Sequence, residues 1–89
     1  MEMSQNQAPI HPGKMLQKEF LKPYHITSTK LAKKIGLSVE QINAVINAQE
    51  SISTDMALRF SQFFGTSPKL WLKAQMKWDV WHLLHGKKE

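Results

Sequence analysis

The sequence predicts an all-α fold: one compact domain of five helices, the last of them the longest. Apolar residues recur at the three- and four-residue spacing of helices in five segments. Capping residues or proline stand at the starts of these segments, and glycine or proline follows most of them. No segment alternates apolar and polar residues as a half-buried strand does. A chain of 89 residues suits a single domain.

The first helix is expected within residues 11–23. His11 or a neighbour precedes it, Pro12 suits an early helical position, and Pro23 ends it. The residues before this helix are mostly polar, with no capping signal and no helical spacing. Segment 1–10 is therefore predicted to be a flexible N-terminal extension.

The second helix is expected over residues 27–36. Either Thr27 or Ser28 caps its free backbone N–H groups. Gly36 ends it, because glycine adopts the left-handed conformation that terminates helices without strain.

The third helix is expected over residues 37–48. Ser38 is its cap, and Gln41, three residues later, completes a capping box in which each residue bonds the other's backbone. Ile42 and Val45 lie on its apolar face. The sequence thus predicts two short helices on either side of one glycine.

The last two helices are expected over residues 51–65 and 67–85. Gly65 closes the fourth helix, and Ser67 with Pro68 begins the fifth. The fifth helix is apolar on most sides, so it needs burial from more than one direction.

Four residues at fixed intervals, Ala32, Gly36, Ile42 and Val45, are typical of a helix-turn-helix. This motif crosses two helices at a steep angle through a short turn. The crossing needs a small residue, which Ala32 supplies, and the turn needs the positive φ that Gly36 allows. Ile42 and Val45 then anchor the second helix on the first. The alternative is an ordinary helical hairpin in a small bundle.

The net charge of +5 and the pI near 9.7 suit a polyanion such as DNA, or an acidic protein partner. The excess charge lies at the C-terminal end, because segment 69–89 contains five of the lysines. With no cysteine, disulfides and cysteine zinc sites are excluded. No signal peptide and no apolar stretch of about 20 residues is found, so a soluble cytoplasmic protein is expected.

No signature of an enzyme is present: neither a phosphate-binding loop nor a nucleophile elbow nor a zinc-protease motif. The sequence therefore predicts a non-enzymatic protein without cofactor or small-molecule substrate. His82 and His85 have a spacing that can hold a metal, but a fortuitous pair is the preferred interpretation and no metal is expected.

A helix-turn-helix places the N-terminal and outward residues of its second helix against base edges in the major groove of DNA. Asparagine and glutamine bond adenine, glutamate accepts from cytosine, and small apolar groups touch the thymine methyl. The predicted base contacts are Ser38, Val39, Glu40, Gln41, Asn43, Ala44 and Asn47, and the predicted phosphate contacts at the preceding helix start are Ser28, Thr29 and Lys30. The alternative is that these residues form a solvated face.

Residues 10–81 carry a resemblance in the stretches "HPGKML", "KLAKKIGLSVEQIN" and "GTSPKLWLKAQ", followed by Asp79. They resemble the HigA-type (VapI-type) antitoxins of the Xre-like helix-turn-helix group. The resemblance implies a lambda-repressor-like fold and the antitoxin of a two-gene, type II toxin–antitoxin module. Such a protein binds operator DNA as a dimer, represses its own operon and neutralises a small ribosome-dependent mRNA-cleaving toxin.

The sequence departs from that family where DNA would bind. Relatives tend to carry arginine in the recognition helix and a Gly-Lys-Arg-like turn after it. This chain has Glu40-Gln41 in the helix and Ala48-Gln49-Glu50 in the turn. Acidic residues near phosphates oppose binding, and arginine is the commonest guanine contact. Weak or A·T-leaning DNA binding is therefore expected.

The fifth helix is predicted to be the dimerisation element of a domain that spans residues 11–85, with a tail over 86–89. Its far end, Trp78, Trp81 and Leu84, is expected to pack against a second copy. The alternative is that it packs only on its own domain.

Arg59 is the only arginine, and a structural ion pair, for example with Glu19, is expected for it rather than a catalytic role.

Two other functions stay open at this stage. One is a stand-alone Xre-like transcriptional regulator without a toxin partner. The other is a protein-interaction module that keeps the fold with weakened DNA binding.

Overall fold

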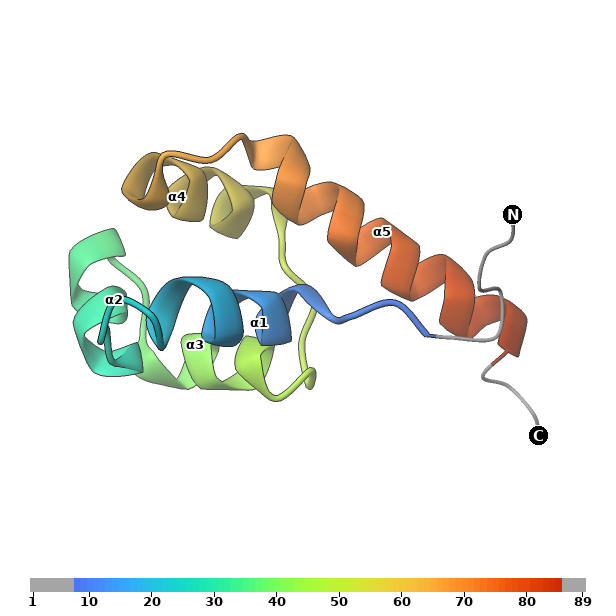
Figure 1. Cartoon of the computed structure of the whole chain (residues 1–89), viewed down its shortest axis with the longest axis horizontal. Coiled ribbons are helices and arrows are strands. Elements are labelled where there is room, and N and C mark those ends of the chain that lie inside the picture. Colours follow the sequence, from blue (N-terminus) through green and yellow to red (C-terminus); the bar gives the residue numbers. More distant parts are fainter. Residues whose placement is uncertain (1–7, 86–89) are drawn as a thin grey trace.

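The computed structural model describes residues 8–85, and this part of the chain is built from helices without strands (Figure 1). The expected all-α fold with five helical regions is confirmed. The elements are α1 (Pro12–Met15), η1 (Leu16–Leu21), α2 (Ser28–Ile35), α3 (Val39–Ile46), α4 (Thr54–Phe64) and α5 (Pro68–His85). Residues 1–7 of the flexible extension predicted over 1–10, and the predicted tail over 86–89, lie outside the described residues.

Hydroxyl side chains cap the helices that the sequence predicted. Thr27, rather than Ser28, caps α2, with its Oγ1 accepting from the Lys30 amide at 3.0 Å. At α3, the Ser38 Oγ accepts from the Gln41 amide at 3.1 Å while Gln41 Oε1 accepts from the Ser38 amide at 3.0 Å. The expected capping box is therefore confirmed.

Two glycines end helices as predicted. Gly36 follows α2 with φ of 78°, and Gly65 follows α4 with φ of 76°. Both lie in the left-handed region, which residues with a Cβ adopt at a cost of about 1 kcal/mol. The chain can therefore reverse direction within a few residues at both points.

The first helix differs from the single α-helix expected over 11–23. A short α-helical turn, α1, continues into η1, a π-helix in which the Lys22 amide bonds the Gln17 carbonyl at 3.0 Å. In such a helix residues five apart share a face. Leu16 and Leu21 consequently both enter the core, being 0% and 4% exposed.

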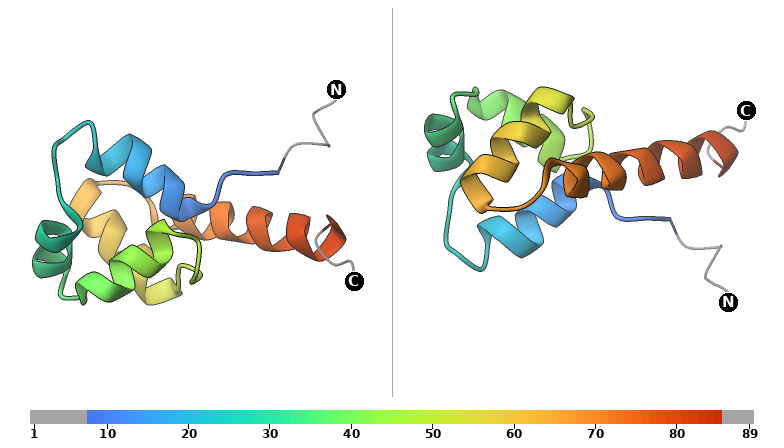
Figure 2. Two further views of the ribbon diagram at one scale, coloured as in Figure 1. Left: turned by 90° about the horizontal axis from the view of Figure 1, so that it is seen from below. Right: turned by 90° about the horizontal axis from the view of Figure 1, so that it is seen from above.

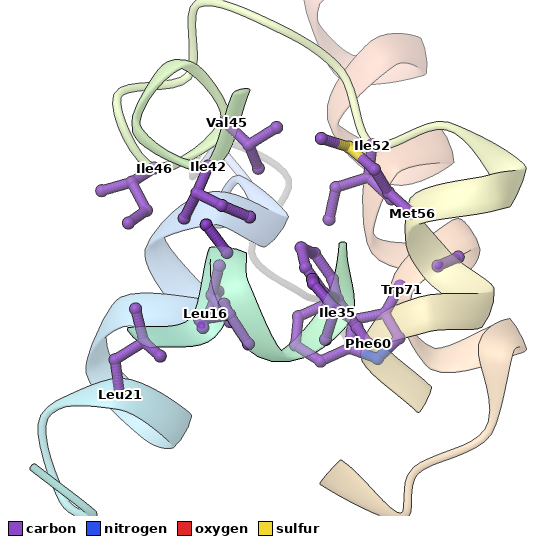
Figure 3. Packing of buried hydrophobic residues seen from close by; sticks show 13 residues of the cluster. Leu16, Leu21, Ile35, Ile42, Val45, Ile46, Ile52, Met56, Phe60 and Trp71 are labelled. Carbon is purple, nitrogen blue, oxygen red and sulfur yellow. The ribbon is translucent and has the colours of Figure 1, made fainter. Parts of the chain in front are cut away.

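The core lies where α1, η1, α2, α3 and α4 converge, with α5 closing one side (Figure 3). Trp71 of α5 and Phe60 of α4 are fully buried, with ring centroids 5.1 Å apart. The indole N–H of Trp71 donates to Thr66 Oγ1 at 2.8 Å, so its one polar group is satisfied. The start of α5 is thereby fixed to the domain.

The other helices cover α5 from its start to Trp78, which contacts His11, and the helix beyond Trp78 extends past them (Figure 2). Both views in Figure 2 show its distal half projecting away from the body formed by α1 to α4. Val80 and Leu83 in that half are 50% and 74% exposed. No helix in the described part of the chain is long and apolar enough to cross a membrane.

Candidate nucleic-acid interface

The two helices around Gly36 pack as a helix-turn-helix. Ala32 of α2 is 5% exposed at the crossing, and Ile42 and Val45 of α3 are fully buried. These are the positions where the motif needs a small residue and two apolar anchors. α3 lies at the edge of the helical body, below α1 in Figure 1, so its other side faces solvent.

The outward side of α3 is a polar surface. Glu40, Gln41 and Asn43 are exposed, as is Asn47 just after the helix, and Val39 and Ala44 are half-buried. Because no lysine or arginine lies within Val39–Ile46, this surface carries no positive side chain. Its chemistry suits hydrogen bonding to base edges more than neutralising phosphates.

Gln41 and Asn43 differ in the hydrogen bonds that they already make. Gln41 Oε1 accepts from the Ser38 amide and also from the Ser38 hydroxyl, at 3.2 Å. A paired contact with adenine needs both the oxygen and the nitrogen of the amide, so Gln41 must release the cap to make it. Within residues 8–85, no hydrogen bond occupies the Asn43 side chain.

The start of α2 is a possible phosphate site. Thr27 caps the Lys30 amide. Among the described residues, the side chains of Ser28, Thr29 and Lys30 form no hydrogen bond of their own. Thr29 and Lys30 are exposed and Ser28 is half-buried. The positive end of the α2 dipole lies here, which favours an anion.

Lys22 and His25 join this helix start, and sequence reasoning did not identify them. Both line a surface hollow whose other lining residues are Gln17, Leu21, Ile26, Thr27, Ser28 and Ile46. His25 has φ of 57°, and this turn returns the chain toward α2. Spacing along the chain carries no signal for this placement, because the turn geometry determines it.

The turn after α3 is tightly held but lacks positive charge. Ala48 has φ of 60°, a left-handed conformation that is strained for a residue with a Cβ. The amides of Gln49 and Glu50 both donate to the Ala44 carbonyl, at 2.8 and 3.2 Å. Glu50 is exposed beside the end of α3.

Arg59 forms a structural ion pair as expected, but the expected partner, Glu19, is wrong. Arg59 Nε donates to Asp55 Oδ2 at 2.8 Å, one turn earlier on α4, and its Nη1 donates to the Ile35 carbonyl. Glu19 is an exposed residue of η1. Arg59 therefore caps the C-terminal end of α2, where a cation is favoured by the helix dipole.

The residues predicted for dimerisation have different surroundings. Trp78 is half-buried against His11 of the same chain, with ring centroids 4.9 Å apart. Trp81 is half-buried and stacks on His85 at 4.3 Å, whereas Leu84 is 74% exposed. In residues 8–85, no group of three or more potential metal ligands is present.

Comparison with known proteins agrees with this geometry. A family model described as Helix-turn-helix matches residues 17–71. Virulence-associated protein I of Dichelobacter nodosus is 38% identical over 76 residues, which cover 84% of this chain and 70% of the relative.

Two solved structures extend the likeness. PA4674 of Pseudomonas aeruginosa in complex with its operator DNA has a TM-score of 0.87 at 31% identity, covering 93% of this chain and 89% of that one. The antitoxin HigA of Pseudomonas aeruginosa with the higBA promoter has a TM-score of 0.81 at 34% identity, covering 88% and 87%. The chain therefore belongs to the helix-turn-helix family of DNA-binding proteins, among the HigA-type (VapI-type) antitoxins and Xre-like regulators.

Proposed function

We propose that this protein is the antitoxin of a type II toxin–antitoxin module in the cytoplasm. It binds operator DNA as a homodimer, represses its own operon and neutralises a ribosome-dependent mRNA-cleaving toxin. The DNA-binding part rests on the two faces of α3. Ile42 and Val45 are buried on its inner face, while its outer face is polar and exposed. The similar solved structures that contain operator DNA support the same assignment.

In this proposal α3 is the recognition helix and lies in the major groove. Asn43 makes the paired contact with adenine, and Val39 and Ala44 touch thymine methyl groups. Ser28 and Lys30 at the start of α2 hold a phosphate of the DNA backbone. The interface thus separates positioning contacts on α2 from base contacts on α3.

DNA binding is proposed to be weak for one copy of the chain and to prefer A·T-rich sites. Glu40 and Glu50 are exposed on or beside the recognition helix and repel phosphates. Affinity rises with the number of phosphates neutralised, and this helix neutralises none. A dimer compensates because two copies double the contacts made with one duplex.

The toxin is proposed to bind on the side formed by the N-terminal segment and the first helix, away from α3. An apolar hollow of about 410 Å³ lies between this segment and α5. Ile10 and Leu70 line it and are exposed, while Lys73 and Lys77 also line it. Apolar side chains rimmed by lysines suit a protein partner better than a nucleic acid base.

The DNA-binding part is tested by fluorescence anisotropy with the duplex upstream of the gene and a scrambled duplex, at several salt concentrations. We expect at least ~10³-fold preference for the promoter duplex, the lower end for specific DNA binders. Equal and weak binding to both duplexes would remove the repressor role. Glu50→Lys should then tighten binding to both duplexes and steepen the salt dependence.

The toxin part is tested by expressing the small protein encoded beside this gene, alone and together with this chain. We expect growth arrest and loss of mRNA when that neighbour is expressed alone, and recovery when both are present. A neighbour that forms a complex but never arrests growth would contradict the antitoxin assignment while leaving DNA binding untouched.

A further inference from the structure

The turn His11–Pro12–Gly13 lies between the recognition helix and α5. On one side, Gly13 packs directly on the backbone of α3. A Cβ built at Gly13 would lie 1.8 Å from the Val45 carbonyl oxygen and 2.9 Å from the Ile46 Cα. Since both are backbone atoms, α1 and α3 are in contact without intervening side chains.

On its other side the same turn contacts α5 through His11. The His11 side chain is 3% exposed, and its ring packs edge-on against Trp78 of α5 with centroids 4.9 Å apart. His11 Nδ1 accepts a hydrogen bond from the Gly13 amide at 2.9 Å. This bond caps α1 and also requires that Nδ1 carry no proton.

A second connection joins α5 to the chain that follows α3. Gln75 is 6% exposed, and its Oε1 accepts from the Ile52 amide at 2.8 Å. Its Nε2 donates to Asp79 Oδ1 at 3.0 Å. One face of α5 therefore holds the loop between α3 and α4 through Gln75 and the start of α1 through Trp78.

We propose that His11 is a positioning residue for operator binding: its neutral ring fixes the angle between the recognition helix and α5, and its protonation loosens that joint. This inference rests on the proposed function, because it assumes that α3 reads DNA and that α5 sets its placement in a dimer. Two recognition helices must match the spacing of two half-sites, so a changed angle lowers the affinity for the operator.

Protonation would place a hydrogen on Nδ1, opposite the Gly13 N–H, and turn the cap into a contact between two donors. Burial lowers the pKa of His11 below its ordinary value, and Lys14 of α1 and His82 of α5 lower it further. Asp79 of α5 acts in the other direction and raises it. Glu40, the one charged residue of α3, is not among the groups that shift this pKa.

The direction of the pH effect follows from the lowered pKa. Between the unfolded pKa, about 6.5, and the folded one, the unfolded chain binds more protons than the folded chain. The stabilisation from neutral His11 is therefore fully present above about pH 6.5 and is lost as the pH falls through the folded pKa. Operator affinity depends on the folded protein alone, so it should fall as the pH passes downward through the folded pKa of His11, below about 6.5.

The first measurement needs no DNA. Amide and indole resonances of the full chain are followed by NMR from about pH 7.5 to about pH 4.0, a range that extends well below the ordinary histidine pKa because the pKa of His11 is lowered. We expect the Gly13 amide, the Trp78 indole and the Val45 and Ile46 amides to shift with one midpoint. If His11 titrates while the Val45 and Ile46 amides stay unmoved, the joint does not reach the recognition helix and the proposal is overturned.

The second measurement is the affinity for the promoter duplex over the same pH range, with the scrambled duplex alongside. We expect the wild type to lose about fivefold in affinity on acidification, which is the size of a lost helix cap. His11→Asn should be insensitive to pH, since asparagine caps a helix without titrating. The matched control His85→Asn, at an exposed histidine near the end of α5 and outside the DNA interface, should keep the pH dependence of the wild type.

The outcomes separate this proposal from the proposed function. Absence of promoter preference at every pH removes the DNA-binding role, while the NMR titration still reports on the joint. A decline of equal size in His11→Asn and the wild type would overturn the positioning role. Far-ultraviolet circular dichroism at each pH shows that the variants remain folded, and NMR of the wild type decides the question if His11→Asn unfolds.

Discussion

At the scale of single residues, the backbone constrains three positions, and the constraint differs from one position to the next. Gly13 permits α1 to touch α3, whereas Gly65 is needed only for its φ of 76°, since a Cβ at Gly65 would have no neighbour within 4 Å. Ala48 occupies a left-handed conformation, with φ of 60°, that glycine would adopt without strain. Substitutions at these three positions should therefore change the stability of the domain in different ways.

Gly13→Ala should destabilise the domain by more than about 2 kcal/mol, because the new methyl group meets backbone atoms that cannot rotate away. Gly65→Ala is the matched control, and it should cost about 1 kcal/mol, from its φ alone. Urea unfolding followed by tryptophan fluorescence measures both. Equal losses in the two variants would contradict the close contact between α1 and α3.

Ala48→Gly should stabilise the protein by about 0.5–1 kcal/mol, since it relieves the left-handed strain after α3. Ala44→Gly, inside α3, should instead destabilise by about 1 kcal/mol, as glycine does in a helix interior. The measurement is the urea midpoint of each variant against the wild type. Destabilisation by both changes would show that Ala48 is not strained.

At the scale of elements, the stretch Gly65–Gln75, one of those that carry the resemblance, forms the structural connection between α4 and α5. Several side chains of this stretch have a packing or capping role. Ser67 Oγ accepts from the Leu70 amide at 3.3 Å, Thr66 accepts from Trp71, and Gln75 accepts from Ile52. The stretch Gly65–Gln75 therefore fixes how α5 leaves α4.

Substitutions of Gln41 and Asn43 on α3 should affect different properties, Gln41 the stability of the domain and Asn43 its binding to the operator. Gln41→Ala removes half of the capping box and should lower stability by about 0.5–1 kcal/mol. Asn43→Ala should change stability by less than about 0.5 kcal/mol but weaken operator binding by about 1–3 kcal/mol. Thermal unfolding and anisotropy are compared for both variants. Loss of operator affinity from Gln41→Ala at unchanged stability would reverse the two roles.

At the scale of the whole molecule, α5 has two unlike faces. Trp71, Gln75 and Trp78 face the body of the domain. Val80 and Leu83 lie on the other side, in the projecting half of the helix (Figure 2). Apolar surface that stands away from the body favours contact with another chain.

Leu83→Glu combined with Leu84→Glu should therefore convert a dimer into a monomer without unfolding the domain. Both side chains are 74% exposed, so neither contributes to the core. Lys77→Glu, a charge change on the same helix, is the control and should remain dimeric. Sedimentation velocity measures the assembly state, and a wild type that is monomeric at high concentration would refute the dimer.

The sequence alone determined the helices, their capping residues and the helix-turn-helix, because these depend on neighbours a few residues away. Thr27, Ser38 and Gly36 act within one helical turn, so spacing along the chain reveals them. The same local reasoning placed Asn43 on the outward face of α3 and Ile42 on the inward one.

Only the tertiary structure decided which distant groups meet. Arg59 donates to the Ile35 carbonyl because the end of α2 lies against α4 and supplies an acceptor. Its ion pair with Asp55, by contrast, is local, one turn along α4. Likewise, His11 meets Trp78, far away in the sequence, because α1 lies between α3 and α5. Contacts between elements depend on how the helices cross, and the crossing is settled by packing of the whole core rather than by any one segment.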